Sequence, residues 1–307
     1  MARKSIFEQL SGKKNFLSEI RRIDKLLKDK SGIDIEVFYQ NTSFYQEPQF
    51  MNIGIENFVD TYIFKDWKGR GTCIDCNDML ETLGLKEILN DSEYITENDI
   101  LSYLEYAANI LRLVNNVKFR NGASYNMTKV YYAAFDNVNS CLDWLNFETK
   151  TFSEKDIVLV VQKNAAATSV AELVDEELAY SIIGYNHFLL KGNIDEKRKI
   201  LLKLANEIEP RRKELEKINY KLADNIFYMF NNLNIRHNNC KIGDKHYKEY
   251  VAKMSESELE EWYDKLYQET LLANLLLDDE NEKIKIEKLR KNIEKKHSGQ
   301  IQKADGK

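Results

Sequence analysis

Residues 220–250 read YKLADNIFYMFNNLNIRHNNCKIGDKHYKEY and contain the end of one amphipathic helix, a polar turn and the approach to a second helix. Apolar residues recur at helical spacing over 215–233, which predicts a buried face along the first helix. Ser255 and Glu258 form the pattern of a capping box, and apolar and aromatic residues then repeat over 259–275. The stretch therefore predicts two long helices joined by a polar turn, the core of a helical domain.

The composition of the chain sets the class of protein. The 307 residues include only two prolines and twelve glycines, which suits long helices and is too few for an all-β sandwich. The net charge of −5 means that any nucleic-acid partner has to meet a local basic patch. Four cysteines do not indicate a disulfide framework, and no apolar run approaches the roughly 20 residues of a membrane-spanning helix. We therefore expect a mainly α, reduced, cytoplasmic protein with no membrane partner.

The helical pattern divides the chain into three parts. Residues 1–95 alternate helical stretches with polar loops, and we expect a smaller, loop-rich helical region with at most minor strands. Well-patterned helices dominate residues 96–280, beginning with a capping box at Thr96, and form the expected C-terminal helical domain. Residues 281–307 are rich in Lys and Glu, which predicts a charged helix extension and a disordered tail. One run, 156–162, has the Val- and Ile-rich composition of a strand.

The polar turn gathers the residues best suited to chemistry, which are Arg236, His237, Asn238, Asn239 and, further on, His246. An arginine supplies a permanent charge for a phosphate, and a histidine can take up or release a proton near neutral pH. Metal-free RNA cleavage requires both, because a base must deprotonate the 2′-hydroxyl and a cation must stabilise the phosphorane. The same residue types are equally typical of an ordinary helix C-terminus, where Asn accepts left-handed backbone and Arg or His complements the helix dipole.

With a long helix, an Arg-Asn-His-rich turn and a second long helix, residues 95–280 resemble the HEPN superfamily of bacterial abortive-infection and toxin proteins. The resemblance implies a helical bundle, a homodimer and a metal-independent ribonuclease that targets RNA in antiphage defence, with no cofactor and with a phage component as trigger. Arg236 matches the arginine of the family motif, and Asn238 or Asn239 can stand for its polar residue. The family's histidine four to six residues after the arginine is missing here. Either the role of that histidine has moved, to His237 or to His246, or the domain is a degenerate, non-catalytic relative of the family.

A non-enzymatic interpretation is the main alternative. In it, the chain is a helical binding or sensor protein of a defence system, and the turn at Arg236 only supports a helix end. The basic tail or tyrosine-rich surfaces would then meet a partner. This interpretation predicts that loss of Arg236 or His237 lowers stability rather than activity.

A zinc site is a further hypothesis. Cys73 and Cys76, and likewise His237 and Cys240, have the two-residue gap that lets two ligands reach one ion. A single CxxC pair is a weak signal, and the two pairs lie far apart in the sequence. We therefore predict small packed side chains here and no metal.

Two other polar positions, Arg70 and His187, are candidate sites. Arg70 lies between two glycines before a predicted helix, where backbone N–H groups can bind an anion, so it is a secondary candidate for contact with an anionic ligand. His187 precedes the apolar run 188–190, and a lone histidine in such a context is predicted to be a packed, hydrogen-bonded side chain.

Overall fold

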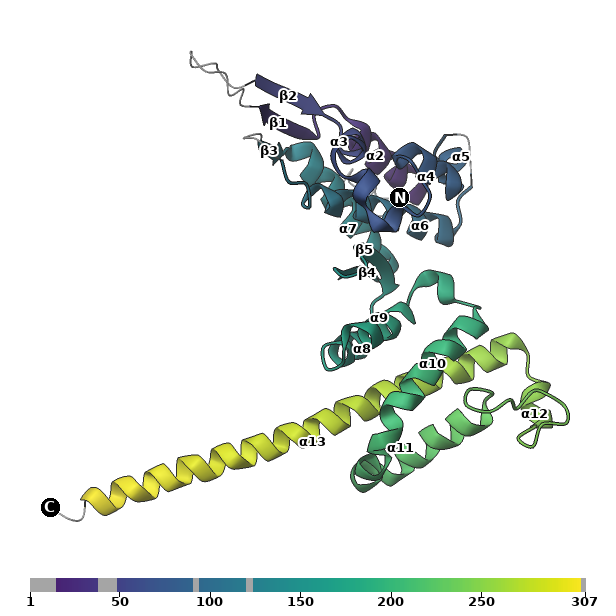
Figure 1. Ribbon diagram of the computed structural model, residues 1–307, viewed down its shortest axis with the longest axis vertical. Helices are drawn as coiled ribbons and strands as arrows, with labels where there is room; N and C mark the ends of the chain where they lie inside the picture. Colours follow the sequence, from purple (N-terminus) through teal and green to yellow (C-terminus); the bar gives the residue numbers. More distant parts are fainter. Residues whose placement is uncertain (1–14, 38–48, 91–93, 120–123, 305–307) are drawn as a thin grey trace, which may run out of the picture. The chain divides into compact units, whose positions relative to one another are not determined.

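The computed structural model describes residues 15–37, 49–90, 94–119 and 124–304, with side chains as far as Ile293. Most of this part of the chain is helical and five short strands accompany the helices, so the mainly α prediction is confirmed (Figure 1). The chain forms two compact units, Met1–Lys163 and Asn164–Lys307.

This division differs from the boundary predicted near residue 95. Helix α6 (Glu97–Val114), which the prediction placed in the C-terminal domain, packs in the first unit against α2 (Phe16–Lys28) and α3 (Ile55–Tyr62). Helix α7 (Lys129–Leu145) also packs against α2 and α6. The reason is that α6 is buried around most of its circumference and therefore needs neighbours on several sides, which the preceding helices provide.

Two small antiparallel sheets complete the first unit. In one, β1 (Ile33–Val37) lies between β2 (Gln49–Ile53) and β3 (Ser124–Met127). In the other, β4 (Phe147–Phe152) pairs along its whole length with β5 (Ile157–Gln162), which confirms the strand predicted at 156–162. The remaining helical segments of this unit are short, namely η1 (Phe64–Asp66), η2 (Lys68–Arg70), α4 (Cys76–Thr82) and α5 (Leu85–Asn90).

The second unit is built around α13 (Glu256–Ala304), whose first half packs against α8, α10 and α11. The capping boxes predicted at Thr96 in the first unit and at Ser255 here are both confirmed, since each hydroxyl accepts from the backbone N–H three residues later. The other elements are α8 (Ala165–Ala171), α9 (Glu176–Gly184), η3 (Phe188–Leu190), α10 (Ile194–Ile208), η4 (Glu209–Arg211), α11 (Arg212–Asn232) and α12 (Glu249–Ala252).

Two details of the second unit depart from the expected helices. The small-residue run at 165–169 forms part of helix α8, because alanine favours helix and the Asn164 side chain caps the helix by accepting from the Ala167 N–H. Pro210 lies in η4, which interrupts the helix between α10 and α11. A second interruption lies inside α11 at Asn219, whose backbone is extended and whose side chain accepts from the Leu222 N–H to restart the helix.

Candidate functional site

The polar turn after α11 is anchored at its first residue. The Leu233 N–H closes the last turn of α11 on the Met229 carbonyl, and the Leu233 carbonyl accepts a 3.1 Å hydrogen bond from the Tyr263 hydroxyl of α13. Asn234 then takes the left-handed conformation, with φ of 58°, that an asparagine tolerates better than most residues. The turn therefore begins at a fixed point between the two long helices of the unit.

Asn239 holds the rest of the loop together. Its side chain is fully buried, its Oδ1 accepts from the Asn234 N–H at 2.7 Å, and its own N–H donates to Asn234 Oδ1 at 3.1 Å. The Asn239 Nδ2 donates to the His246 carbonyl at 2.8 Å, and the Lys248 N–H donates to the Asn239 carbonyl. Every one of these partners lies between residues 234 and 248. Asn239 is therefore a positioning residue, which fixes the backbone of this segment. Asn238, by contrast, is exposed.

Arg236 is held by residues of α10 and η4, which precede α11 in the chain. Its guanidinium makes a bidentate ion pair with Glu209, at 2.7 and 2.9 Å, and Nη2 also donates to the Ala205 carbonyl of α10. The group lies over the Phe227 and Phe230 rings of α11, and only 12% of the side chain is exposed. A phosphate would have to displace Glu209 to reach this guanidinium. In this arrangement Arg236 ties the turn to α10 instead of presenting a free charge.

His237 and His246 come together in the loop. Their rings stack with centroids 3.9 Å apart and an interplanar angle of 10°, and both side chains are partly exposed. Burial lowers the pKa of His237 below its usual 6.5, and the neighbouring His246, Lys245 and Arg236 lower it further. His237 is therefore predominantly neutral at pH 7 and can accept a proton. Of the predicted site residues, these two offer the clearest proton-transfer chemistry.

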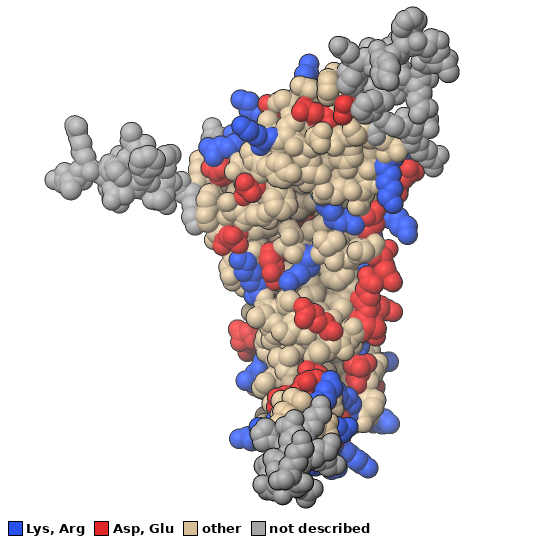
Figure 2. All heavy atoms as spheres, turned by 90° about the vertical axis from the view of Figure 1, so that its left-hand side faces the viewer, with Lys and Arg blue, Asp and Glu red and all other residues tan. Residues whose placement is uncertain are grey.

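The loop carries local positive charge on a chain that is acidic as a whole. Lys241, Lys245 and Lys248 are exposed, and the carboxylate of Asp244 accepts from the His246 N–H. On the face drawn in Figure 2, basic and acidic side chains are interspersed, as expected for a small net negative charge. The three exposed lysines give this loop positive charge that contact with an anionic polymer would use.

The residues of the zinc hypothesis do not form a cluster. Cys73 and Cys76 are buried in the first unit, and burial, followed by the Asp60 carboxylate, raises the pKa of the Cys76 thiol far above its usual range. Cys240 in the polar loop also has a raised pKa because of burial. Within the residues that the structure describes, no group of three or more His, Cys, Asp or Glu side chains could hold a metal ion.

Arg70 and His187, the two secondary candidates, both make contacts with residues close by in the sequence. Arg70 donates from Nε to the Lys65 carbonyl and from Nη1 to the Cys73 carbonyl at 2.8 Å, so it closes its own turn. The ring of His187 packs against Phe188 with centroids 4.4 Å apart, and its Nδ1 accepts from the Leu189 N–H. The packed role predicted for His187 agrees with this geometry.

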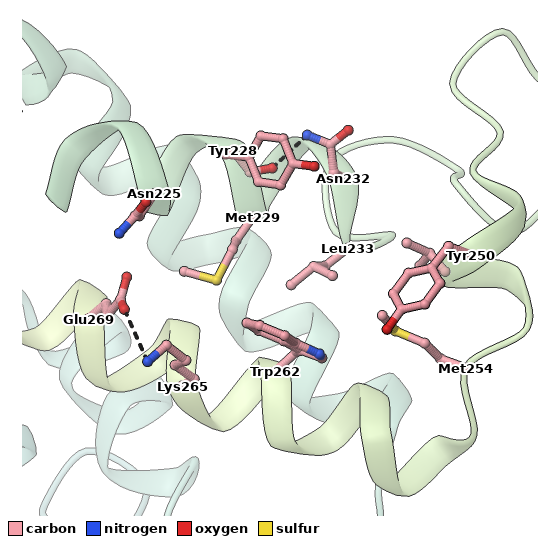
Figure 3. Close-up of a pocket in the computed structure, with 11 residues that line it drawn as sticks. Asn225, Tyr228, Met229, Asn232, Leu233, Tyr250, Met254, Trp262, Lys265 and Glu269 are labelled. Carbon is pink, nitrogen blue, oxygen red and sulfur yellow. Dashed lines mark hydrogen bonds and ion pairs between the residues drawn. The ribbon is translucent and has the colours of Figure 1, made fainter. Parts of the chain in front are cut away.

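A pocket of about 310 Å³ lies next to the polar loop, between α11, α12 and α13 (Figure 3). Its lining is mostly apolar and includes three aromatic side chains, Tyr228, Tyr250 and Trp262, which are 66, 75 and 41% exposed. Trp262 falls in the apolar and aromatic repeat over 259–275, whose helical spacing predicts a buried side chain, and its exposure corrects that prediction. Helical periodicity alone missed the pocket, because Tyr228 and Trp262 lie on different helices and face each other only after folding.

Comparisons of the chain with protein-family models, curated proteins and solved structures found no match. Among the described helices, none is long and apolar enough to cross a membrane.

Proposed function

We propose that the chain is a HEPN-like, RNA-targeting protein of bacterial abortive infection, and that the loop 236–248 is where it meets RNA. The observation that carries the proposal is the stack of His237 and His246 on a loop with exposed lysines, between two long helices. The homodimer and the phage component as trigger belong to the same proposal and rest on the family resemblance.

The chemistry assigned to this loop is metal-independent cleavage of the RNA backbone. One imidazole accepts the proton of a 2′-hydroxyl, the 2′-oxygen bonds to the adjacent phosphorus, and the bond from phosphorus to the 5′-oxygen breaks. The leaving oxygen takes a proton from an imidazolium, so the reaction needs one neutral and one protonated histidine. The stack holds both imidazoles side by side, as a base and an acid that act on one phosphodiester require. The lysines stabilise the charge on phosphorus, and Arg236 positions the turn.

The test compares purified wild-type chain with His237→Ala and His246→Ala on single-stranded RNA and on total RNA. We expect cleavage by the wild type and at least a hundredfold slower cleavage by each variant, the order of magnitude of general acid–base catalysis. His187→Asn is the matched control, because Asn can keep the hydrogen bond to the Leu189 N–H. In a bacterial host, the same variants should lose growth arrest during phage infection. Intact RNA with the wild type would remove the ribonuclease from the proposal.

The non-enzymatic alternative has one specific observation in its favour. The bidentate pair of Arg236 with Glu209 and its hydrogen bond to Ala205 are the contacts of a structural arginine. If the turn only supports the fold, the chain is a helical binding or sensor protein. Arg236→Ala and His237→Ala should then lower the melting temperature. Variants of the turn that keep the wild-type melting temperature should keep full protective activity against phage.

A further inference from the structure

We propose that the pocket between α11, α12 and α13 binds one unpaired nucleobase of a single-stranded RNA whose phosphates cross the loop 236–248. This inference rests on the proposed function in that it requires RNA as the ligand, and it does not require RNA cleavage. It assigns a role to the exposed aromatic side chains that the histidine chemistry leaves unused.

The apolar part of the pocket is built for a planar ring. Met229 and Leu233 of α11 and Trp262 of α13 point toward one another across its floor, while Tyr228 and Tyr250 stand at its rim (Figure 3). Exposed aromatic side chains that gather around one pocket mark an interaction site, and unpaired RNA bases commonly stack on such rings. The volume of about 310 Å³ is at the lower end of ligand pockets, which suits one base and not a large ligand.

Polar groups at one end of the pocket match the hydrogen-bonding edge of a base. Asn225 and Glu269 lie together at this end (Figure 3), and Lys265 is 3.6 Å from Glu269 Oε1. Glu269 Oε2 has no hydrogen-bond partner among the described residues. The Asn232 Nδ2 donates to the Tyr228 carbonyl, which orients its amide at the rim. Amides and carboxylates are the groups that read base edges, whereas a purely apolar ligand would offer Glu269 Oε2 no hydrogen-bond donor.

The pocket and the lysine-bearing loop are continuous along the chain. Lys248, whose N–H is fixed by Asn239, precedes α12, and Tyr250 is the second residue of that helix. An aromatic pocket beside exposed lysines fits a ligand that alternates bases with phosphates. A free anion would not use the aromatic rings, and a free apolar molecule would not use the lysines.

The test measures binding apart from cleavage. The probes are fluorescein-labelled oligoribonucleotides of about ten residues with 2′-O-methyl ribose, which cannot react by 2′-hydroxyl attack. Fluorescence anisotropy compares wild type with Tyr250→Ala, Tyr228→Ala and Trp262→Leu. We expect each variant to bind about tenfold more weakly, as for loss of one base–aromatic stack, and Tyr250→Phe to bind like the wild type. Trp144→Leu in the first unit is the matched control, because Trp144 is 43% exposed against 41% for Trp262.

Three results would overturn the inference: no binding of any single strand, equal binding by wild type and the Tyr250→Ala and Trp262→Leu variants, or a mononucleotide that binds as tightly as the oligonucleotide. The last would make the ligand a free nucleotide. Cleavage assays on unmodified RNA are scored separately. Aromatic-dependent binding without cleavage would therefore keep the base pocket and reject the ribonuclease.

Discussion

His237 and His246, nine positions apart, stack as parallel rings because Asn239 between them fixes the intervening backbone. The Asn239 side chain donates to the His246 carbonyl, and its own N–H donates back to Asn234 at the start of the turn. The contact between the imidazoles is thus a consequence of one buried amide. It follows that the proton chemistry and the stability of the loop can be tested by separate substitutions.

The first prediction concerns the proton affinity of His237. Burial, followed by the charge of His246, lowers the pKa of His237 below 6.5, so an NMR titration of the imidazole signals should place it beneath that value. In His246→Ala the pKa of His237 should rise toward 6.5, because one of the opposing charges is gone. Since the unfolded chain binds the proton more readily, this group lowers stability as pH falls through 6.5, and has no such effect at higher pH. A pKa at or above 6.5 in the wild type would contradict the combined effect of partial burial and of the neighbouring positive groups on His237.

The second prediction separates two adjacent asparagines. Asn239→Ala removes two side-chain hydrogen bonds and leaves the Asn234 N–H and the His246 carbonyl without them, so the free energy of unfolding should fall by about 2 to 3 kcal/mol. Asn238→Ala, at an exposed position, should change it by less than about 0.5 kcal/mol. Urea titrations of both variants provide the comparison, and equal effects would refute the assigned difference between them.

The third prediction concerns the anchor of the turn. Arg236→Ala breaks the ion pair with Glu209 and the hydrogen bond to Ala205, and we expect a loss of about 1 to 2 kcal/mol, limited because Glu209 is more than half exposed. Arg236→Lys should recover little of this, because an ammonium cannot make the bidentate pair. Thermal melts give the measurement, with Glu209→Gln as the partner variant. If Arg236→Ala melts like the wild type, Arg236 is not an anchor and its charge is free for a ligand.

The fourth prediction concerns a buried carboxyl in the first unit. Burial raises the pKa of Glu56 to about 7, although Lys28 and the hydrogen bond donated by the Tyr106 hydroxyl lower it. The folded state holds the proton more tightly than the unfolded state. Stability should therefore be fully present below pH 4.5 and fall by up to about 3 kcal/mol as pH rises to about 7.

Glu56→Gln supplies the control for that pH dependence. The glutamine oxygen can still accept from the Tyr106 hydroxyl but cannot ionise, so the variant should lose most of the decline between pH 4.5 and 7. Denaturant midpoints measured across this range test it. A variant with the same pH profile as the wild type would show that another group is responsible.

The elements that the sequence predicted well are those whose signal is local. The capping boxes at Thr96 and Ser255 and the Val-rich strand at 156–162 depend on residues a few positions apart, and all three are present. The boundary predicted near 95 failed because it depends on which elements α6 packs against, a property of distant residues. The sequence could not predict the partners of Arg236 either, since Glu209 and Ala205 precede α11 and Arg236 follows it.

Every described side chain from 281 to 293 on α13 is exposed, including Ile286, Leu289 and Ile293. A helix that buries nothing is sustained by backbone hydrogen bonds and by pairs such as Lys283 with Asp279, and isolated helices of this length are marginal in water. This half of α13 should therefore melt gradually, at lower temperature than the units, and unwind further in concentrated salt. The helical state of this segment is only marginally stable, so a molecule that covers its exposed apolar residues would stabilise the helix on binding.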